Sequence, residues 1–296
     1  MLYLVIFVFP TLINSQVLDT DLSDGLNAEG VSIKYLEGSS EPFKGHVFNY
    51  YPNGNRELKG NYSRGLKEGK WVWWYPNGEK NKTGYYVRSL EDSIWQWWFK
   101  NGQLMKRGKY KKGKKEGRWS EWYEDGTLAN SFGYIDDKPN GKCLKKFANG
   151  EKQIEIMYNY GIKSGIEKEW NENGIPVYEN NWKDGLKDGA QIIWAGNGLI
   201  LSKHRYSKGM LHGEYIDYYK SGQKSIVGNY RFGKKHGTWT YSYKDGVIAL
   251  SGNYRNGNPK GSWFWIRANK SEMVNVDDPD KDWVTKRIRE WERIYN

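Results

Sequence analysis

The sequence predicts an all-β protein: an elongated single-layer antiparallel meander of tandem 24-residue β-hairpin repeats, closed by a C-terminal capping α-helix. Three columns of residues in one register predict this fold. A glycine recurs every 24 residues, a second glycine follows nine residues later, and an aromatic residue follows seventeen residues after the first. The first column contains Gly45, Gly69, Gly117, Gly141, Gly165, Gly189, Gly213, Gly237 and Gly261, and only Ser93 interrupts it. Such a period indicates an array in which each unit packs on its neighbours.

Each unit is expected to contain one β-hairpin, because an Asn-Gly or Asp-Gly pair stands at the second glycine. Both residues of such a pair tolerate the positive φ angles of a type I′ turn, so the pair predicts a two-residue turn. The pairs are Asn53-Gly54, Asn77-Gly78, Asn101-Gly102, Asp125-Gly126, Asn149-Gly150, Asn173-Gly174, Asn197-Gly198 and Asp245-Gly246. Counting outward from the turn at Asn77, Trp71 faces Gly84 and Gly69 faces Tyr86.

The spacing of rings and glycines also predicts the two faces of the sheet. A glycine has no Cβ, so an aromatic ring of the partner strand can lie flat on its backbone. We therefore expect each first-column glycine to lie beneath a tyrosine. The glycine opposite the tryptophan, such as Gly84 opposite Trp71, is expected to lie beneath that tryptophan. If residues 113–116 form the loop between two hairpins, Tyr110 faces Trp119 and these rings share one face. The other face then carries Val72, Trp74 and mainly polar residues.

The N-terminal part departs from the repeat. Residues 1–15 are apolar and uncharged and resemble a secretory signal with cleavage before Gln16, although no Lys or Arg precedes the apolar run. We therefore expect a secreted, periplasmic or cell-envelope protein, or a cytoplasmic one if this segment is not a signal. Residues 16–44 contain a degenerate repeat, and the tandem repeats follow over residues 45–266.

The C-terminal region, residues 267–296, changes period. Asp278-Pro279 is typical of a helix start, with a capping residue followed by proline at the first helical position. Residues 279–295 then predict an amphipathic helix that covers the edge of the last strand. A helix that binds a partner or a membrane surface is the alternative.

Composition and motifs favour binding over catalysis. The formal net charge is +11, so anionic partners suit the chain, although a lysine-rich solvated sheet surface has the same composition. Cys143 is the single cysteine, which excludes an intrachain disulfide and a cysteine metal site. No metal-ligand spacing, nucleophile elbow or phosphate-binding loop appears in the sequence. We expect a protein that is not an enzyme and needs no cofactor or metal.

The repeat resembles the MORN repeat, in the variant form common in bacterial proteins. The run Tyr-x-x-Gly-x-x-x-Gly-x-Trp-x-x-Tyr-x-x-Asn-Gly is similar to residues 62–78, 110–126 and 230–246. The resemblance implies an extended β-hairpin array. Similar chains are often labelled YwqK-family antitoxin, and eukaryotic relatives have scaffolding or lipid-associated roles. The family motif contains no catalytic residue, so the resemblance assigns none.

These observations predict a non-enzymatic scaffold for protein–protein interaction, exported or associated with the envelope. The alternatives are a glycan or cell-wall binder, including acidic glycans, and an anionic-lipid binder; nucleic acid is not an expected partner because no recognised motif is present. The candidate aromatic row for a protein or glycan contains Trp74, Trp98, Trp122, Trp170, Trp194 and Tyr218. The candidate basic row for lipid, expected in loops, contains Lys67, Lys115, Lys163, Lys187 and Lys235.

Overall fold

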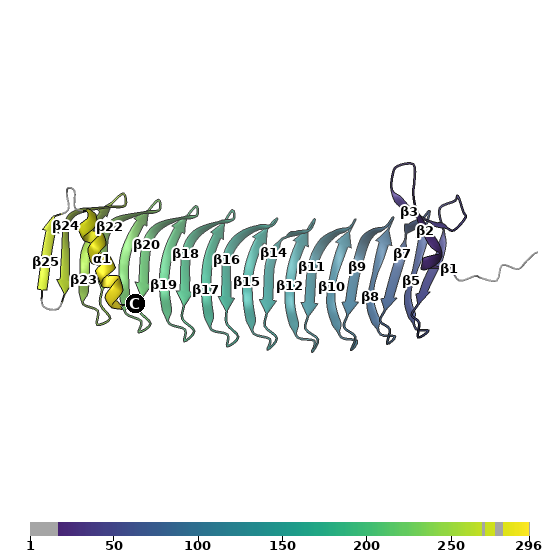
Figure 1. The fold of residues 1–296 in the computed structure, drawn as a ribbon, viewed down its shortest axis with the longest axis horizontal. Coiled ribbons are helices and arrows are strands. Elements are labelled where there is room, and N and C mark those ends of the chain that lie inside the picture. Colours follow the sequence, from purple (N-terminus) through teal and green to yellow (C-terminus); the bar gives the residue numbers. More distant parts are fainter. Residues whose placement is uncertain (1–16, 268–269, 276–280, 296) are drawn as a thin grey trace, which may run out of the picture. The chain divides into compact units, whose positions relative to one another are not determined.

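The structure, a computed structural model, describes residues 17–267, 270–275 and 281–295. It divides into two compact units, Met1–Gly126 and Thr127–Asn296. Both consist of antiparallel β-hairpins, and α1 (Lys281–Tyr295) belongs to the second unit (Figure 1). The predicted all-β fold of hairpin repeats with a C-terminal helix is confirmed. The signal-like segment predicted at residues 1–15 lies outside the described residues.

The first unit begins with short elements and continues as a meander of longer strands. The short elements are β1 (Val17–Leu18), the 3-10 helix η1 (Asp19–Asp21), β2 (Leu22–Leu26) and β3 (Ser32–Leu36). The repeat strands are β4 (Gly45–Tyr50), β5 (Arg56–Ser63), β6 (Leu66–Lys67), β7 (Gly69–Trp74), β8 (Lys80–Val87), β9 (Leu90–Trp98), β10 (Leu104–Lys111) and β11 (Lys114–Trp122). From β4 to β11, strands that follow one another along the chain pair antiparallel, except that β6 and β7 both pair with β5.

The second unit continues the repeat and ends in the helix. Its strands are β12 (Leu128–Ile135), β13 (Lys138–Pro139), β14 (Gly141–Lys146), β15 (Lys152–Asn159), β16 (Ile162–Trp170), β17 (Pro176–Lys183), β18 (Leu186–Trp194), β19 (Ile200–Ser207), β20 (Met210–Tyr218), β21 (Lys224–Arg231), β22 (Lys234–Ser242), β23 (Ile248–Arg255), β24 (Asn258–Arg267) and β25 (Lys270–Asn275). These strands also pair antiparallel with their neighbours in the chain, except that β13 and β14 both pair with β12.

The predicted register within each hairpin is confirmed. Strands β7 and β8 pair Gly69 with Tyr86 and Trp71 with Gly84. In the second unit, the equivalent pairing places Gly237 opposite Tyr254. Paired residues share a face of the sheet, so the period of 24 residues puts each column of side chains on one fixed face.

The turn at the Asn-Gly pair differs from the prediction. Tyr75 N donates to Glu79 O (2.7 Å) and Gly78 N donates to Tyr75 O (2.9 Å), which leaves a three-residue loop between Tyr75 and Glu79. Gly78 has φ +88°, whereas Asn77 is not in the positive region, so this is not a type I′ turn. The predicted register survives because a bulge at Asn81 offsets the extra loop residue.

The two-residue turns lie between hairpins instead. Lys112 (φ +51°) and Gly113 (φ +79°) join β10 to β11, and Tyr110 pairs with Lys115. The predicted loop over residues 113–116, with Tyr110 paired to Trp119, is therefore wrong. The other turns with two positive φ angles are Arg64-Gly65, Arg88-Ser89, Asp136-Asp137, Tyr160-Gly161, Asp184-Gly185, Lys208-Gly209, Phe232-Gly233 and Asn256-Gly257. These are the angles of a type I′ turn.

The first-column glycines are bulge residues and do not lie beneath tyrosine rings. The pairing of β10 with β11 shifts between Arg107 and Lys109, and Gly117 stands in the resulting bulge with φ +67°. A Cβ added at Gly117 would meet no atom within 4 Å, so the position requires the backbone angle and not the space. Ser93, the exception in the column, adopts the same conformation with φ +59°, and its hydroxyl donates to Asp92 Oδ1 (3.0 Å).

The other recurrent glycines do lie beneath tryptophans, but of the next strand. A Cβ at Gly84 would come within 2.1 Å of the indole of Trp95, so Gly84 is covered by Trp95 on β9 and not by its pairing partner Trp71. The bulge that precedes Trp95 shifts this side chain over the preceding strand. The same contact joins Gly60 to Trp71, Gly108 to Trp119, Gly228 to Trp239 and Gly252 to Trp263.

Hydrogen bonds between successive repeats explain why a tyrosine and an acidic residue also recur in the repeat. Tyr75 Oη donates to Trp98 O (2.8 Å), 23 residues later. At the two-residue turns, the carboxylate of Glu68 accepts a hydrogen bond from Arg88 N (3.0 Å). Asp188 accepts an equivalent bond from the backbone amide of Lys208 (3.1 Å). The acidic residues that follow Lys67 and Lys187 therefore accept hydrogen bonds from the two-residue turns of the following repeat.

The N-terminal segment packs on the first repeat. Strands β2 and β3 form a separate two-stranded sheet, and β1 pairs parallel with β4 through Val17 and Val47. Leu22 joins a buried cluster that includes Val47 and Tyr62, and Tyr62 Oη donates to Asp19 Oδ1 (3.0 Å). The residues that precede the repeats thus cover Tyr62 and its neighbours at one end of the sheet face that carries the stacked rings of the first unit.

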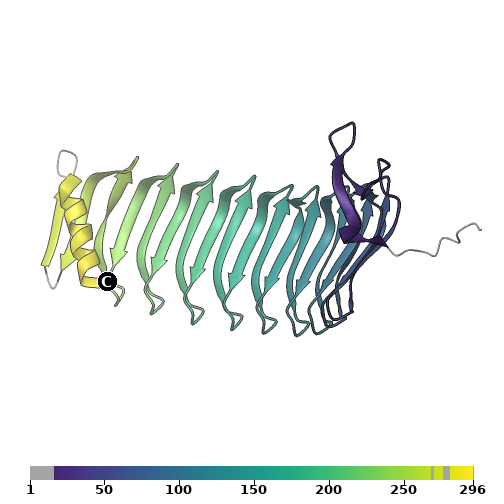
Figure 2. The same cartoon turned by 45° about the vertical axis from the view of Figure 1, so that its right-hand side comes forward.

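Helix α1 is present as predicted, but it lies on a face of the sheet and not along its last edge (Figures 1 and 2). Val284 and Trp291 pack into a buried cluster with Tyr241 and Leu250. Trp291 Nε1 also donates to Ser242 O (3.2 Å) on β22. The difference follows from the helix's apolar stripe, which buries more area against aromatic side chains than along a strand edge.

We expect Ser93→Gly to stabilise the protein, because Ser93 is an L-residue held in the left-handed region. The gain in the free energy of unfolding is about 1 kcal/mol, the cost of that conformation for a residue with a Cβ. Urea titration monitored by tryptophan fluorescence measures it. The matched change Gly117→Ser should cost a similar amount, and a lower urea midpoint for Ser93→Gly would contradict the bulge assignment.

We expect Gly84→Ala to lower the free energy of unfolding by about 1–3 kcal/mol, because its methyl group overlaps the indole of Trp95. Gly196→Ala is the control, since a Cβ at Gly196 meets no atom within 4 Å. Both variants are compared by urea denaturation. Equal midpoints for the two variants would show that no ring covers Gly84.

Candidate binding surfaces

The two faces of the repeat sheet carry different side chains. The ring face carries the tryptophans that cover glycines together with their neighbours, among them Trp71, Trp73, Trp95, Trp97 and Trp119. Their rings are in contact, as between Trp73 and Trp95, whose centroids are 6.0 Å apart. The opposite side, here called the Trp74 face, carries Val72, Trp74 and the polar residues that alternate with the ring-face residues along each strand.

The basic row expected in loops lies on the ring face. Its lysines are half-buried strand residues next to the two-residue turns. Their ammonium groups lie above ring centroids: Lys67 above Trp71 (4.7 Å), Lys115 above Trp119 (5.0 Å), Lys163 above Trp182 (4.6 Å), Lys187 above Tyr206 (5.0 Å) and Lys235 above Trp239 (4.2 Å). The placement in loops is wrong because the turns end before these residues.

Burial affects the pKa of three lysines of the ring face. Loss of solvent lowers the pKa of Lys67, Lys82 and Lys235 below the usual value for lysine. Attraction to the negative faces of the rings offsets part of the cost of burying the charge. The ammonium groups therefore serve as packing partners of the indoles, and their long stems cover apolar surface.

The predicted aromatic row lies on the Trp74 face and is half-buried. This applies to Trp74, Trp98, Trp122, Trp170, Trp194 and Tyr218. Cations approach several of these rings: Arg56 Cζ lies 5.6 Å from the centroid of Trp74, and Lys80 Nζ lies 5.9 Å from that of Trp98. Aromatic and basic side chains therefore share this face in the first unit.

A cavity of about 520 Å³ opens on the Trp74 face of the first unit. It is lined in part by His46, Arg56, Lys59, Lys70, Val72 and Trp74. Arg56, Lys59 and Lys70 are exposed, and the described residues place no carboxylate within ion-pair distance of these three. The cavity thus combines a ring, an aliphatic side chain and an excess of positive charge over the carboxylate of Glu68, which also lines it and accepts a hydrogen bond from Arg88 N.

Ion pairs offset part of the positive charge on the same face of the second unit. The contacts are Lys142 with Glu155 (2.8 Å), Lys168 with Glu179 (2.9 Å) and Lys203 with Glu214 (3.9 Å). Glu155 and Glu179 occupy the column in which the first unit has Lys59. Lys59 and Lys70 of the first unit have no such ion pair among the described residues.

On the ring face of the second unit, polar side chains replace the tryptophan–glycine contact. The column of Trp71, Trp95 and Trp119, here called the tryptophan column, continues with Cys143, Glu167, Gln191 and Tyr215, and then contains Trp239. The column of the glycines beneath these rings (Gly60, Gly84 and Gly108), here called the glycine column, changes at the same repeats: it continues with Phe132, Ile156, Asn180 and His204, and then contains Gly228. Wherever the large ring is absent, a side chain fills the position that glycine would leave open.

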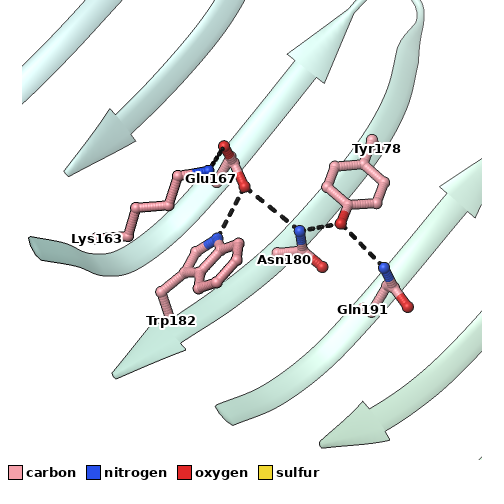
Figure 3. Close-up of polar contacts among 6 residues, drawn as sticks. All are labelled: Lys163, Glu167, Tyr178, Asn180, Trp182 and Gln191. Atoms are coloured by element: carbon pink, nitrogen blue, oxygen red, sulfur yellow. Dashed lines mark hydrogen bonds and ion pairs between the residues drawn. The ribbon is translucent and has the colours of Figure 1, made fainter. Parts of the chain in front are cut away.

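Glu167 is the centre of a buried polar network in these repeats (Figure 3). Its carboxylate, only 6% exposed, accepts hydrogen bonds from Lys163 Nζ (2.7 Å), Trp182 Nε1 (2.8 Å) and Asn180 Nδ2 (3.4 Å). Burial raises the pKa of Glu167, but these hydrogen bonds and the charge of Lys163 outweigh it and leave the pKa lowered. The carboxylate is therefore held ionised.

The network extends to the next strands. Tyr178 Oη accepts hydrogen bonds from Asn180 and from Gln191 Nε2 (3.0 Å). One repeat further, Tyr215 stacks on His204, with centroids 3.9 Å apart, and both contact Asp217. This network was not predicted from the sequence, although the tryptophan and glycine columns, followed together, contain its signal.

Neither metal chemistry nor a membrane-spanning helix is found in the described part of the chain. Over residues 17–267, 270–275 and 281–295, no group of three or more His, Cys, Asp or Glu side chains is placed to hold a metal ion. Within the same ranges, no helix has the length and apolar character that crossing a bilayer demands. Glu167, the most buried of the carboxylates described above, is engaged by three donors of the protein itself.

Comparison with known proteins identifies the repeat. The profile described as MORN repeat variant matches residues 44–64, 67–88, 91–112, 115–136, 163–184 and 235–256. No curated protein matches the chain. Among solved structures, a chain of the TcdB2–TccC3–Cdc42 crystal structure is similar over 90% of this chain and 15% of its own length, with 9% identity and a TM-score of 0.17.

We expect Glu167→Gln to lower the free energy of unfolding by about 1–3 kcal/mol at pH 7, because it removes the charge that Lys163, Asn180 and Trp182 stabilise. A lowered folded-state pKa contributes stability above the unfolded pKa, near 4, and that stability is lost as the pH falls through the folded value. The difference from the unsubstituted protein should therefore shrink between about pH 5 and pH 3.

Urea denaturation at several pH values measures this difference. Glu172→Gln is the control, because Glu172 is exposed and should show no change at any pH. A difference that stays constant from pH 7 to pH 3 would contradict the ionised state of Glu167.

Proposed function

Because six segments of the chain match the MORN repeat variant profile, we propose that the chain is a non-enzymatic scaffold that binds a protein partner through the Trp74 face of its first unit. The partner presents acidic side chains and an apolar or aromatic group. The observation that carries this proposal is the cavity beside Trp74, where the exposed cations Arg56, Lys59 and Lys70 lack carboxylate partners among the described residues.

Charge and ring chemistry support this choice. Tryptophan and arginine dominate the energetics of protein interfaces, and cations without an internal partner attract acidic surfaces. Arg56 already lies over Trp74, so an incoming carboxylate can pair with Arg56 without separating it from the ring. Ion pairs occupy the same columns in the second unit, which makes that unit the weaker candidate.

A glycan that stacks on the aromatic row is less well supported. Stacking needs free ring faces, whereas cations lie near the rings of Trp74, Trp98 and Trp170 at 5.4–5.9 Å. Lipid binding through the lysine row is also less well supported, because those ammonium groups lie on rings of the ring face. Export and an antitoxin role stay predictions, the first from residues 1–15 and the second from the resemblance.

Site-specific photo-crosslinking in the native host tests the proposal. A benzoyl-phenylalanine placed at Trp98 should form an adduct with a protein, whereas the same probe at Trp194, in the same column of the second unit, should not. Lys59→Glu combined with Lys70→Glu should reduce the adduct about tenfold, as expected for charges that steer and hold an acidic partner.

The matched control is Lys203→Glu combined with Lys142→Glu, which changes the same two columns in the second unit and should leave the adduct unchanged. Circular dichroism verifies that all variants are folded. Adducts of equal yield from Trp98 and Trp194, or an adduct that survives Lys59→Glu with Lys70→Glu, would overturn the assignment. Binding of an acidic polysaccharide or of anionic vesicles in place of a protein would favour the alternatives.

A further inference from the structure

We propose that the ring face of the first unit, around Trp73 and Trp97, is a second binding surface that receives an amphipathic helix with acidic side chains from a partner protein. It lies on the opposite side of the sheet from the Trp74 face, so the two proposals stand or fall separately. The chain's own helix α1, bound to equivalent columns of the second unit, supplies the main evidence.

Helix α1 shows how a helix binds to this repeat. Val284 and Trp291, both buried, lie against Tyr241 and the ring-face residues of β23 and β24. The rings of Trp291 and Tyr241 meet edge to face, with centroids 5.4 Å apart. The indole of Trp291 also donates to Ser242 O (3.2 Å), which fixes the position of the helix along the strand.

The columns beneath α1 recur in the first unit. Tyr241 and Trp265 stand seven periods of 24 residues after Trp73 and Trp97. Under the helix, Tyr241 is 1% exposed and Trp265 is 3% exposed, whereas Trp73 and Trp97 are only half-buried. The same rings are therefore present in the first unit without the cover that α1 provides in the second.

Other parts of the ring face are covered or polar. At the start of the first unit, Leu22 packs into the cluster of Val47, Tyr62 and Trp71. In the middle repeats of the second unit, Glu167 and its partners replace the indoles and satisfy one another by hydrogen bonds. Trp73 and Trp97 thus mark a stretch of rings on which no described helix or N-terminal strand packs, and beside which the side chains of Lys82 and Lys106 lie.

Charge specifies the helix. Lys82 Nζ lies 4.3 Å from the ring centroid of Trp73, and no carboxylate of the described residues is within ion-pair distance of it. Lys106 Nζ lies 5.6 Å from the centroid of Trp97 but already pairs with Glu121 (3.0 Å). In the second unit the helix residue Glu292 lines a cavity together with Lys235, whose ammonium group lies above Trp239, and it favours the charged form of Lys235. A helix on the first unit should likewise present a carboxylate to Lys82, beside Trp73.

A peptide derived from the chain's own helix tests this proposal. The probe contains residues 279–295 with Lys286→Glu, Arg289→Glu and Arg293→Glu, three changes at exposed positions of α1. Binding of the fluorescent peptide to the full chain is measured by polarisation. We expect saturable binding that weakens at least tenfold when the peptide also carries Trp283→Ser and Trp291→Ser, and that is weaker for the peptide with the natural basic residues.

Variants of the protein locate the peptide. Lys82→Glu should weaken binding about tenfold and Lys82→Gln should weaken it less, with the fold verified by circular dichroism. Lys59→Glu, a matched change on the Trp74 face, should have no effect. The proposal is overturned by absent or non-saturable binding, by equal affinity for the peptide without tryptophans, or by a loss with Lys59→Glu and not with Lys82→Glu. Binding unaffected by Lys82→Glu would mean that the peptide displaces α1, which also contradicts the proposal.

Discussion

The contact between a tryptophan and the glycine of the preceding strand is the interaction on which the repeat structure depends. A single-layer sheet has no second layer to bury its side chains, so apolar surface must be buried against the sheet itself. An indole that lies flat on a glycine, as Trp95 does on Gly84, achieves this because the glycine has no Cβ. The bulge before each tryptophan brings the ring over the preceding strand, and it requires a residue that adopts positive φ.

This constraint separates the roles of the two faces. The ring face is used for packing, and lysines such as Lys67 and Lys235 lie on its rings and not in solvent. The Trp74 face is freer to vary, and it differs in charge between the two units because glutamates replace basic residues in the second. Where the ring face loses its tryptophans, around Glu167, a hydrogen-bonded network takes over the burial (Figure 3).

The sequence predicts the hairpin and its register because the 24-residue period and the Asn-Gly pairs specify them locally, and it predicts the helix from Asp278-Pro279 and the amphipathic pattern that follows. It misassigns features that depend on bulges: the turn types are exchanged, and Gly117 serves the backbone and not a ring. The lysines are misplaced for the same reason, since a turn of two residues and not four puts Lys115 in a strand. The position of α1 depends on packing between distant segments, such as Trp291 against Tyr241, which no local pattern contains.

The most direct test of this account is the proton NMR shift of the glycine Hα atoms. A ring that lies flat on a glycine shields its Hα protons, so Gly84, Gly108 and Gly228 should show strong upfield shifts. The bulge glycines Gly69, Gly117 and Gly237, which have no atom within 4 Å of an added Cβ, should show ordinary shifts. Unshifted Gly84 and Gly108 signals, or the same shift in both sets, would contradict the stacking of tryptophan on glycine.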